Sequence, residues 1–290
     1  MRARFSRLAA VLAALVLFVA FQPGAVQAQE RIELTVDASR SGAKIDRNIF
    51  GQFAEHLGSG VYGGIWVGPG SSVPNTRGIR NDVVAALKAL KVPNVRWPGG
   101  CYADDYHWRK GVGPTRAVTL NPSWGGVTES NAFGSHEFMD FLDQIGADAY
   151  LSINLGSGTV QEASEWLEYM TSAQATTLAQ ERAANGHPAP YRVALLGIGN
   201  ESWDCGGNFS PAAYLTQLKD YARFVRNFNP AQQDTVARML KVAVGPGGGS
   251  EPRWTEWTDT IMRGWRDHTW SWDIDGLSLH NYTVPAWPPS

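Results

Sequence analysis

Short apolar runs alternate along the chain with longer stretches in which apolar residues recur every three to four positions. The runs have the length of buried strands and fall at residues 49–53, 94–97, 149–155, 193–198, 241–244 and 274–279. The longer stretches have the period of amphipathic helices and fall at residues 80–91, 135–145, 163–170, 211–228 and 254–263. Such regular alternation predicts an α/β protein, with a parallel sheet covered by helices.

The number of strands limits the architecture further. A complete (β/α)8 barrel has eight strands and eight helices, whereas the pattern from residue 49 shows six strands with five helices between them. The sequence therefore predicts an open sheet or an incomplete barrel. Ahead of it, residues 32–38 alternate apolar and polar side chains, as a half-buried strand does. Residues 171–190 are rich in Ala, Thr and Gln and predict a loop, at least in their second half.

The first residues have the pattern of a signal peptide. Arg2, Arg4 and Arg7 precede an apolar run at 8–21, and small residues then lead up to Ala28. This order predicts a signal peptide at 1–28 that is cleaved after Ala28, with an uncleaved membrane anchor as the alternative. We therefore expect a secreted or periplasmic protein that is not bound to a membrane after cleavage.

Composition narrows the class of partner. Lys and Arg number 25 against 27 Asp and Glu, so no basic excess points to nucleic acid. Twelve Trp residues are an unusually large number, and exposed Trp often stacks on sugar rings. The six His residues are scattered, and the spacings typical of metal or phosphate sites are missing. We expect neither a metal nor a cofactor.

Polar residues follow the predicted strands directly, where the strand ends of a parallel sheet form a binding face. Glu55 follows the first strand, Cys101 the second, Asn200 and Glu201 the fourth, and His280 the sixth. A carboxyl group that closes a buried strand is partly desolvated, as a general acid for glycosidic cleavage requires. The alternative for Glu201 is an exposed carboxylate at the start of a helix.

Several of these segments resemble the α-L-arabinofuranosidases of glycoside hydrolase family 51, a family of retaining clan A barrel enzymes. The resemblance runs in order from about Ile32 to Pro285 and is far more specific than a single motif. It rests on FAEHLG at 53–58, YGGIWVG at 62–68, RWPGGCYADDYHW at 96–108, GIGNE at 197–201 and LHNYTVP at 279–285. The resemblance implies a TIM (β/α)8-type barrel that is incomplete at 49–290. It also implies that residues 29–48 carry one N-terminal strand of a missing C-terminal β-sandwich.

The resemblance also implies roles for individual residues. Glu201 corresponds to the acid/base, and Asn200 to its sugar-binding neighbour. Further substrate-binding residues implied in the same way are Glu55, Cys101, His280, Tyr282 and Trp124. Alternatives stay open for three of them: an ion pair with Arg96 for Glu55, ordinary core for Tyr282, and a surface aromatic for Trp124. Because Cys101 corresponds to a substrate-facing thiol, we expect Cys101 and Cys205 to be free, although export makes a disulfide possible.

One catalytic group of the family has no counterpart here. The nucleophile Glu of the family ends strand seven, which the chain does not reach, so we expect the nucleophile to lie outside this N-terminal fragment. The function implied is a retaining exo-glycosidase that releases terminal α-L-arabinofuranosyl residues from arabinan or arabinoxylan. A xylosidase or endoglucanase of the same clan, or a catalytically inactive sugar-binding protein, is the alternative. Full-length members of the family are often homo-oligomeric.

Overall fold

The computed structural model of the chain describes residues 33–234, 236–247, 253–268 and 272–282. The chain divides into two units, Met1–Lys44 and Ile45–Ser290. The predicted signal peptide at 1–28 lies outside the described residues. Within the described part, no helix is both long enough and apolar enough to cross a membrane.

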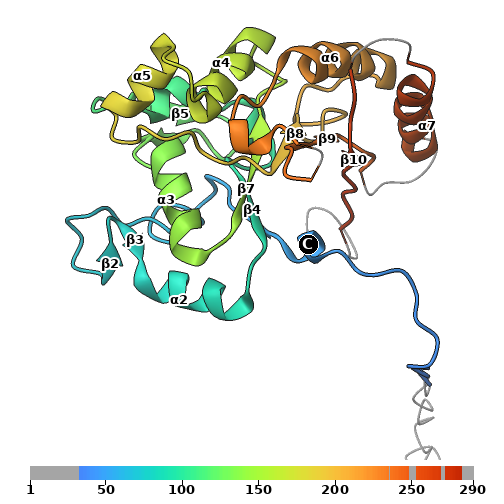
Figure 1. The fold of residues 1–290 in the computed structure, drawn as a ribbon, viewed down its shortest axis with the longest axis horizontal. Helices are drawn as coiled ribbons and strands as arrows, with labels where there is room; N and C mark the ends of the chain where they lie inside the picture. Colours follow the sequence, from blue (N-terminus) through green and yellow to red (C-terminus); the bar gives the residue numbers. More distant parts are fainter. Residues whose placement is uncertain (1–32, 235, 248–252, 269–271, 283–290) are drawn as a thin grey trace, which may run out of the picture. The chain divides into compact units, whose positions relative to one another are not determined.

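The second unit is built on a six-stranded sheet in which every neighbouring pair of strands is parallel (Figure 1). The strands follow the chain order across the sheet: β1 (Gln52–Phe53), β4 (Asn94–Trp97), β7 (Asp148–Ile153), β8 (Leu195–Ile198), β9 (Leu240–Ala243) and β10 (Gly276–Leu277). Each overlaps a run predicted from the sequence, and the prediction of a parallel α/β sheet is confirmed. In register, Val95 lies beside Ala149, and Ile153 beside Ile198.

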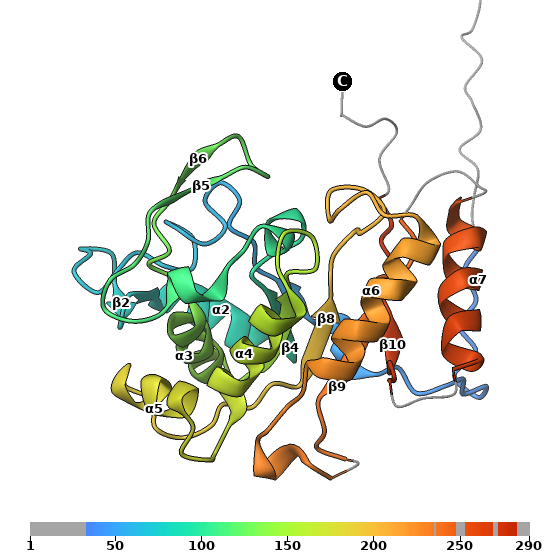
Figure 2. The same cartoon turned by 90° about the horizontal axis from the view of Figure 1, so that it is seen from above.

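Helices connect successive strands and cover the sheet (Figure 2). They are α2 (Asn81–Leu90), α3 (Ser135–Ile145), α4 (Val160–Thr171), α5 (Thr177–Ala184), α6 (Pro211–Phe224) and α7 (Arg253–Arg266). Caps fix where they begin: the side chain of Thr159 accepts from the N–H of Glu162, and that of Ser210 accepts from the N–H of Ala213. Helix α5 falls within residues 171–190, where the sequence predicted a loop.

Shorter elements fill the connections. Two antiparallel pairs are β2 (Asn75–Thr76) with β3 (Ile79–Arg80), and β5 (Thr119–Asn121) with β6 (Val127–Glu129). The 3-10 turns are η1 (Arg47–Phe50), η2 (Cys101–Asp104), η3 (Trp108–Gly111) and η4 (Pro230–Gln232). Turn η2 and the β5–β6 hairpin follow β4 along the chain, so they extend the loop at the carboxyl end of that strand.

The core lies between the sheet and its helices. Trp97 of β4 stacks on Phe138 of α3, with ring centroids 4.9 Å apart, and meets Trp166 of α4 edge-on at 6.1 Å. These pairs attach both helices to one strand. Trp97, Trp108, Trp166 and Trp257 are buried, so much of the unusual Trp content serves packing rather than sugar contact.

The strand expected at residues 32–38 is wrong for the part that is described. Residues 33–38 form no strand, and the side chains of Leu34 and Val36 are 88% and 81% exposed. A strand needs a neighbour to accept its backbone hydrogen bonds, and an alternating pattern alone does not supply one. The assignment of residues 29–48 to a β-sandwich stays a prediction.

Candidate active site

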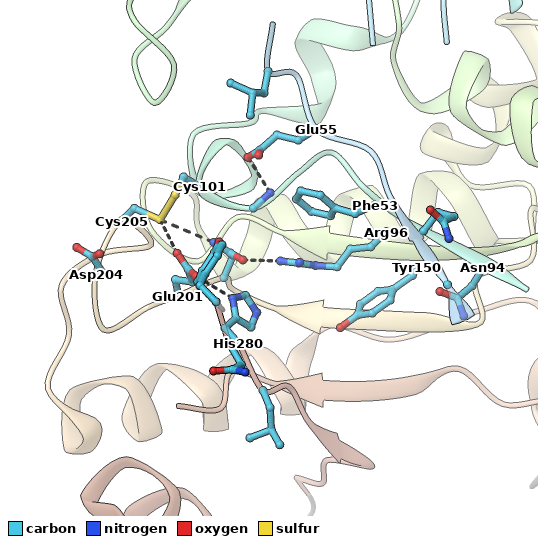
Figure 3. A pocket seen from close by; sticks show the side chains of 18 of the residues that line it. Phe53, Glu55, Asn94, Arg96, Cys101, Tyr150, Glu201, Asp204, Cys205 and His280 are labelled. Atoms are coloured by element: carbon cyan, nitrogen blue, oxygen red, sulfur yellow. Dashed lines mark hydrogen bonds and ion pairs between the residues drawn. A yellow bond between two sulfur atoms is a disulfide. The ribbon is translucent and has the colours of Figure 1, made fainter. Parts of the chain in front are cut away.

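All the predicted site residues line one cavity of about 1230 Å³, and they meet it at the carboxyl ends of the strands (Figure 3). The cavity also extends along the sheet to Asn48 and Asn94 at the amino ends of β1 and β4. Glu55 follows β1, Cys101 begins η2 after β4, and Glu201 follows β8. The remaining members of the predicted set are Asn200 after β8, Trp124 in the β5–β6 turn, and His280 and Tyr282 after β10. The chain thus brings together residues that are up to 227 positions apart, 55 to 282, on one face.

Glu55 is held by backbone rather than by a cation. Its Oε1 accepts from the N–H groups of Gly100, at 2.8 Å, and Tyr102, at 3.2 Å. Gly99 allows this approach, since a Cβ there would lie 2.5 Å from Cγ of Glu55. Arg96 instead donates to Oδ1 of Asn200 at 2.5 Å. Within the described residues no ion pair joins Glu55 to Arg96, so the ion-pair alternative is wrong.

Glu201 occupies an unusual backbone conformation. Its φ is +39°, in the left-handed region that residues other than glycine rarely adopt. Its carbonyl accepts from the N–H groups of Asp204, at 2.7 Å, and Gly206, at 3.1 Å, which closes a tight turn. Such local strain is concentrated at functional sites, because the surrounding structure must hold it in place. The turn directs the carboxylate into the cavity (Figure 3).

The carboxylate of Glu201 has two different neighbours. Nδ1 of His280 lies 2.8 Å from Oε1, and Sγ of Cys205 lies 3.5 Å from Oε2. Both Glu201 and His280 are largely buried, with side chains 12% and 18% exposed. His280 therefore orients the carboxyl group while it still faces the cavity, as a proton donor and acceptor needs to be, whereas the disulfide sulfur of Cys205 has no proton to donate.

Asp104 fixes the position of this turn. Its place after the second predicted strand suggested a supporting role, but not which segments it joins. Its Oδ1 accepts from the N–H groups of Leu155 and Gly156, each at 2.8 Å, and its Oδ2 from the N–H of Asn200 at 3.0 Å. One buried carboxyl group thus joins the loops that follow β4, β7 and β8. Burial raises the pKa of Asp104 to about 7, although these three hydrogen bonds and Arg96 act in the opposite direction.

The expectation of free cysteines is wrong. Cys101 and Cys205 form a disulfide, with Cα atoms 5.5 Å apart. Strand β7 separates β4 from β8 in the sheet, but turn η2 and the turn after Glu201 extend above it and meet. Strand order alone could not reveal that approach. In this state Cys101 presents a disulfide sulfur to the cavity, not the thiol that the resemblance implied.

Aromatic residues complete the cavity. Tyr282 is 63% exposed, so it is not ordinary core. Trp124 is half-buried, and its backbone N–H donates to Oδ1 of Asn121, which fixes the β5–β6 turn beside the cavity. Sequence reasoning missed Phe53, Tyr150 and Trp203, which also line it. The alternation of side chains along β7 could have indicated Tyr150, while Trp203 is placed by the turn after Glu201.

An open, six-stranded parallel sheet whose strand ends line one side of a cavity with three carboxylates is typical of a partial α/β barrel. Comparisons with known proteins are more specific. A family model described as the α-L-arabinofuranosidase 1 domain matches residues 86–271. The chain belongs to the α-L-arabinofuranosidases of glycoside hydrolase family 51.

Individual relatives agree with this family. The chain is 44% identical over 269 residues to an intracellular exo-α-L-arabinofuranosidase of Bacteroides ovatus, covering 91% of this chain and 49% of that protein. A family 51 arabinofuranosidase structure from Xanthomonas axonopodis pv. citri matches with a TM-score of 0.79 and 48% identity over 87% of this chain and 49% of that one. An arabinose complex of the Thermotoga maritima enzyme matches with a TM-score of 0.70 and 38% identity over 81% and 45%. The chain therefore spans about half the length of these relatives.

The prediction of a secreted or periplasmic protein is contradicted. The Bacteroides ovatus relative, which matches 91% of the chain, is named an intracellular enzyme. A short apolar run after basic residues is a local pattern of composition. It carries no information from the fold or the site, and here the finding from the relative overrules it.

Proposed function

We propose that this chain provides the acid/base half of a retaining exo-glycosidase that removes terminal, non-reducing α-L-arabinofuranosyl residues from arabinan- or arabinoxylan-type polysaccharides. The observation that carries the proposal is the strained, oriented Glu201 in a cavity shared with Glu55, in a chain of this family. The Bacteroides ovatus relative is named an exo-α-L-arabinofuranosidase, and the Thermotoga maritima relative has a structure with arabinose.

In this proposal Glu201 protonates the leaving oxygen and later activates water, since one residue performs both tasks in a retaining enzyme. His280 holds Oε1 through Nδ1, which fixes the direction in which the carboxyl group presents its proton. Glu55 and Asn200 bind sugar hydroxyls, and Tyr282 contacts the sugar. Trp124, beside the cavity, meets the leaving-group side.

Retention needs a second carboxylate about 5–5.5 Å from the first. The carboxylates that line the described cavity are Glu55, Asp204 and Glu201 itself. Glu55 is occupied by two backbone N–H groups, and Asp204 is exposed beside Cys205 in the turn. We assign neither as nucleophile. By the family resemblance, that group belongs to a seventh strand.

Ligand binding to the chain itself tests the substrate class. We expect methyl α-L-arabinofuranoside to bind measurably more tightly than methyl β-D-xylopyranoside, with calorimetry or ligand-observed NMR as the measurement. Glu55→Gln should weaken binding of the arabinoside, because the amide loses the charge but keeps an oxygen for the backbone N–H groups. Glu256→Ala, an exposed residue of α7, is the matched control and should not change it. Tighter binding of the xyloside would favour the xylosidase alternative and overturn the proposal.

A further inference from the structure

Three potential metal ligands gather at the edge of the cavity. The Sγ atoms of Cys101 and Cys205 and a carboxylate oxygen of Glu201 all lie within 4.8 Å of one another (Figure 3). They come from two segments that are about a hundred residues apart, since the two cysteines are separated by 104 positions. The family resemblance assigns Cys101 to substrate binding, but neither it nor the proposed function gives a role to a second sulfur atom, that of Cys205, beside the carboxylate.

After reduction of the disulfide, the donor set suits zinc. Two thiolates with one carboxylate are ligands that Zn²⁺ accepts, at about 2.3 Å for sulfur and about 2.0–2.2 Å for oxygen. A sulfur and an oxygen bound to one tetrahedral zinc are therefore about 3.6 Å apart. Sγ of Cys205 lies 3.5 Å from Oε2 of Glu201. That pair already has the spacing of two ligands of one ion. The two sulfur atoms are bonded to each other in this structure, and they would have to separate to about 3.8 Å after reduction to share one ion.

Other features of a metal site are also present. Nδ1 of His280 holds the second oxygen of Glu201 at 2.8 Å, in the way that an outer-shell partner orients a metal-binding carboxylate. Cys205 is exposed, which gives an ion a path from solvent. Asn200 contributes a further polar contact, since its Nδ2 lies 3.8 Å from Sγ of Cys205.

The disulfide determines whether this set is available. Reduction by a dithiol adds two electrons and two protons to the Cys101–Cys205 bond, giving two thiols while the dithiol becomes a disulfide. Disulfides are rare in compartments that keep thiols reduced. We propose that the reduced chain binds one Zn²⁺ through Cys101, Cys205 and Glu201, with release of the two thiol protons and a water in the fourth position. The carboxylate of Glu201 is then a zinc ligand and cannot act as the acid/base at the same time. Only this mutual exclusion rests on the proposed function.

Zinc binding can be measured on the chain without any assay of activity. The protein is reduced with a phosphine, freed of reductant under nitrogen, and titrated with ZnCl₂ against a chromogenic zinc indicator. We expect one tightly bound ion per chain after reduction and none in the oxidised protein. Co²⁺ in place of Zn²⁺ should give thiolate-to-metal charge-transfer absorption, which reports the sulfur ligands directly.

Variants identify the ligands. Cys101→Ser and Cys205→Ser should abolish tight binding, and Glu201→Gln should weaken it by at least the roughly 10–100-fold that loss of an outer-shell partner costs. Asp204→Asn, which removes an exposed carboxylate next to Cys205, is the matched control and should bind zinc normally. Alkylation of the thiols in the reduced wild-type protein should also prevent zinc binding. This test needs no substitution, so a folding defect of a variant cannot explain the result. Equal zinc binding by the oxidised protein or by Cys205→Ser, or no binding after reduction, would overturn the proposal.

Discussion

At the scale of single residues, the proposed acid/base role of Glu201 is supported by its backbone strain and its contact with His280, and it can be tested directly. In an active enzyme with this site, Glu201→Ala should slow hydrolysis of a natural arabinoside by roughly 10²–10⁴-fold. An aryl arabinoside with an acidic phenol leaving group should keep much of its first-step rate, because that leaving group needs no proton. Steady-state and burst kinetics on both substrates measure the difference.

Azide provides a control for this residue. It is small and needs no general base, so it should restore turnover of the glycosyl-enzyme in Glu201→Ala. Two successive inversions give net retention, and the product should be the α-configured arabinosyl azide. If Glu201→Ala slows hydrolysis of both substrates equally and azide does not restore turnover, the acid/base is another residue.

Glu55 gives a second prediction at this scale. Glu55→Ala should weaken arabinose binding by roughly 1.5–3 kcal/mol, since the sugar hydroxyls lose a charged hydrogen-bond partner. Inhibition by arabinose in an active enzyme measures the change. Because Glu55 also accepts from the N–H groups of Gly100 and Tyr102, the Gln variant should keep the thermal stability of the wild type. An unchanged inhibition constant in both variants contradicts the assignment.

Residue types after strands predicted which side chains meet at the cavity, because the ends of parallel strands share one face. The contacts that these side chains make were harder to predict. The pairing of Cys101 with Cys205 depends on how two long turns bend above the sheet, and no local pattern encodes that approach. The role of Asp104 depends on three backbone N–H groups from distant segments, which have no side-chain signature in the sequence.

At the scale of elements, Asp104 links three loops, and its titration should be visible in stability. Burial raises the folded-state pKa to about 7 from an ordinary value of 3.8. Its contribution is therefore fully present below about pH 4 and is lost as the pH rises toward 7. We therefore expect the wild type to lose unfolding free energy relative to Asp104→Asn as the pH rises from about 4 to 7. Urea denaturation at several pH values measures it.

A neighbouring carboxylate is the control for that series. Asp105→Asn removes a group that accepts from Oγ of Ser123 at 2.5 Å and does not join the loops. The difference in unfolding free energy between the wild type and this variant should vary much less between pH 4 and 7. If both variants show the same pH profile, the effect does not belong to Asp104.

Helix α5 depends on a buried arginine. Arg182 is 1% exposed, and its guanidinium donates to the carbonyls of Tyr169, Ser172, His187 and Pro188. It thereby satisfies carbonyl groups at the end of α4 and in the segment after α5. Arg182→Ala should lower the free energy of unfolding by about 3 kcal/mol, because buried acceptors lose their donor. Arg109→Ala should lower the free energy of unfolding by less, about 1 kcal/mol in the same chemical denaturation, since its glutamate partners and its contact with the ring of Trp108 are partly exposed to solvent.

The same helix shows where sequence prediction of elements fails. Periodicity located the strands and the helices that pack on the sheet, because burial on one face imposes a repeat. Helix α5 packs against α4 and has a weak apolar pattern, so the sequence predicted a loop there. The N-cap, in which Thr176 accepts from the N–H of Ala179, was the local signal that could have found it.

At the scale of the whole molecule, the described cavity holds a proposed acid/base but no assigned nucleophile. We expect the 290-residue chain alone to bind the arabinoside but to hydrolyse neither the aryl arabinoside nor the aryl xyloside. The physical reason is that Glu201 has no assigned second carboxylate among the described residues that line the cavity. Release of nitrophenol is the measurement. Activity abolished by Glu55→Gln or Asp204→Asn would identify that residue as the nucleophile and refute our assignment.

The family and the parallel α/β fold could be predicted from the sequence, because ordered motifs over most of the chain leave few alternatives. Cellular location could not, since it rested on a terminal pattern that has no physical connection to the fold. A relative of stated location contradicted it.

The Cys101–Cys205 bond also changes the connectivity of the polypeptide. It closes a covalent ring between residues that are 104 positions apart, and the ring contains the β5–β6 hairpin, α3, β7, α4, α5 and β8. A protease that cuts one peptide bond inside this ring leaves a single molecule of unchanged mass apart from one added water. The same cut outside the ring, for example in α6 or α7, gives two chains with no covalent link between them, which separate when the protein is denatured. The oxidised chain therefore tolerates a break in α5 without dissociating, and its two sulfur atoms keep the turn of Glu201 joined to the loop that carries Cys101.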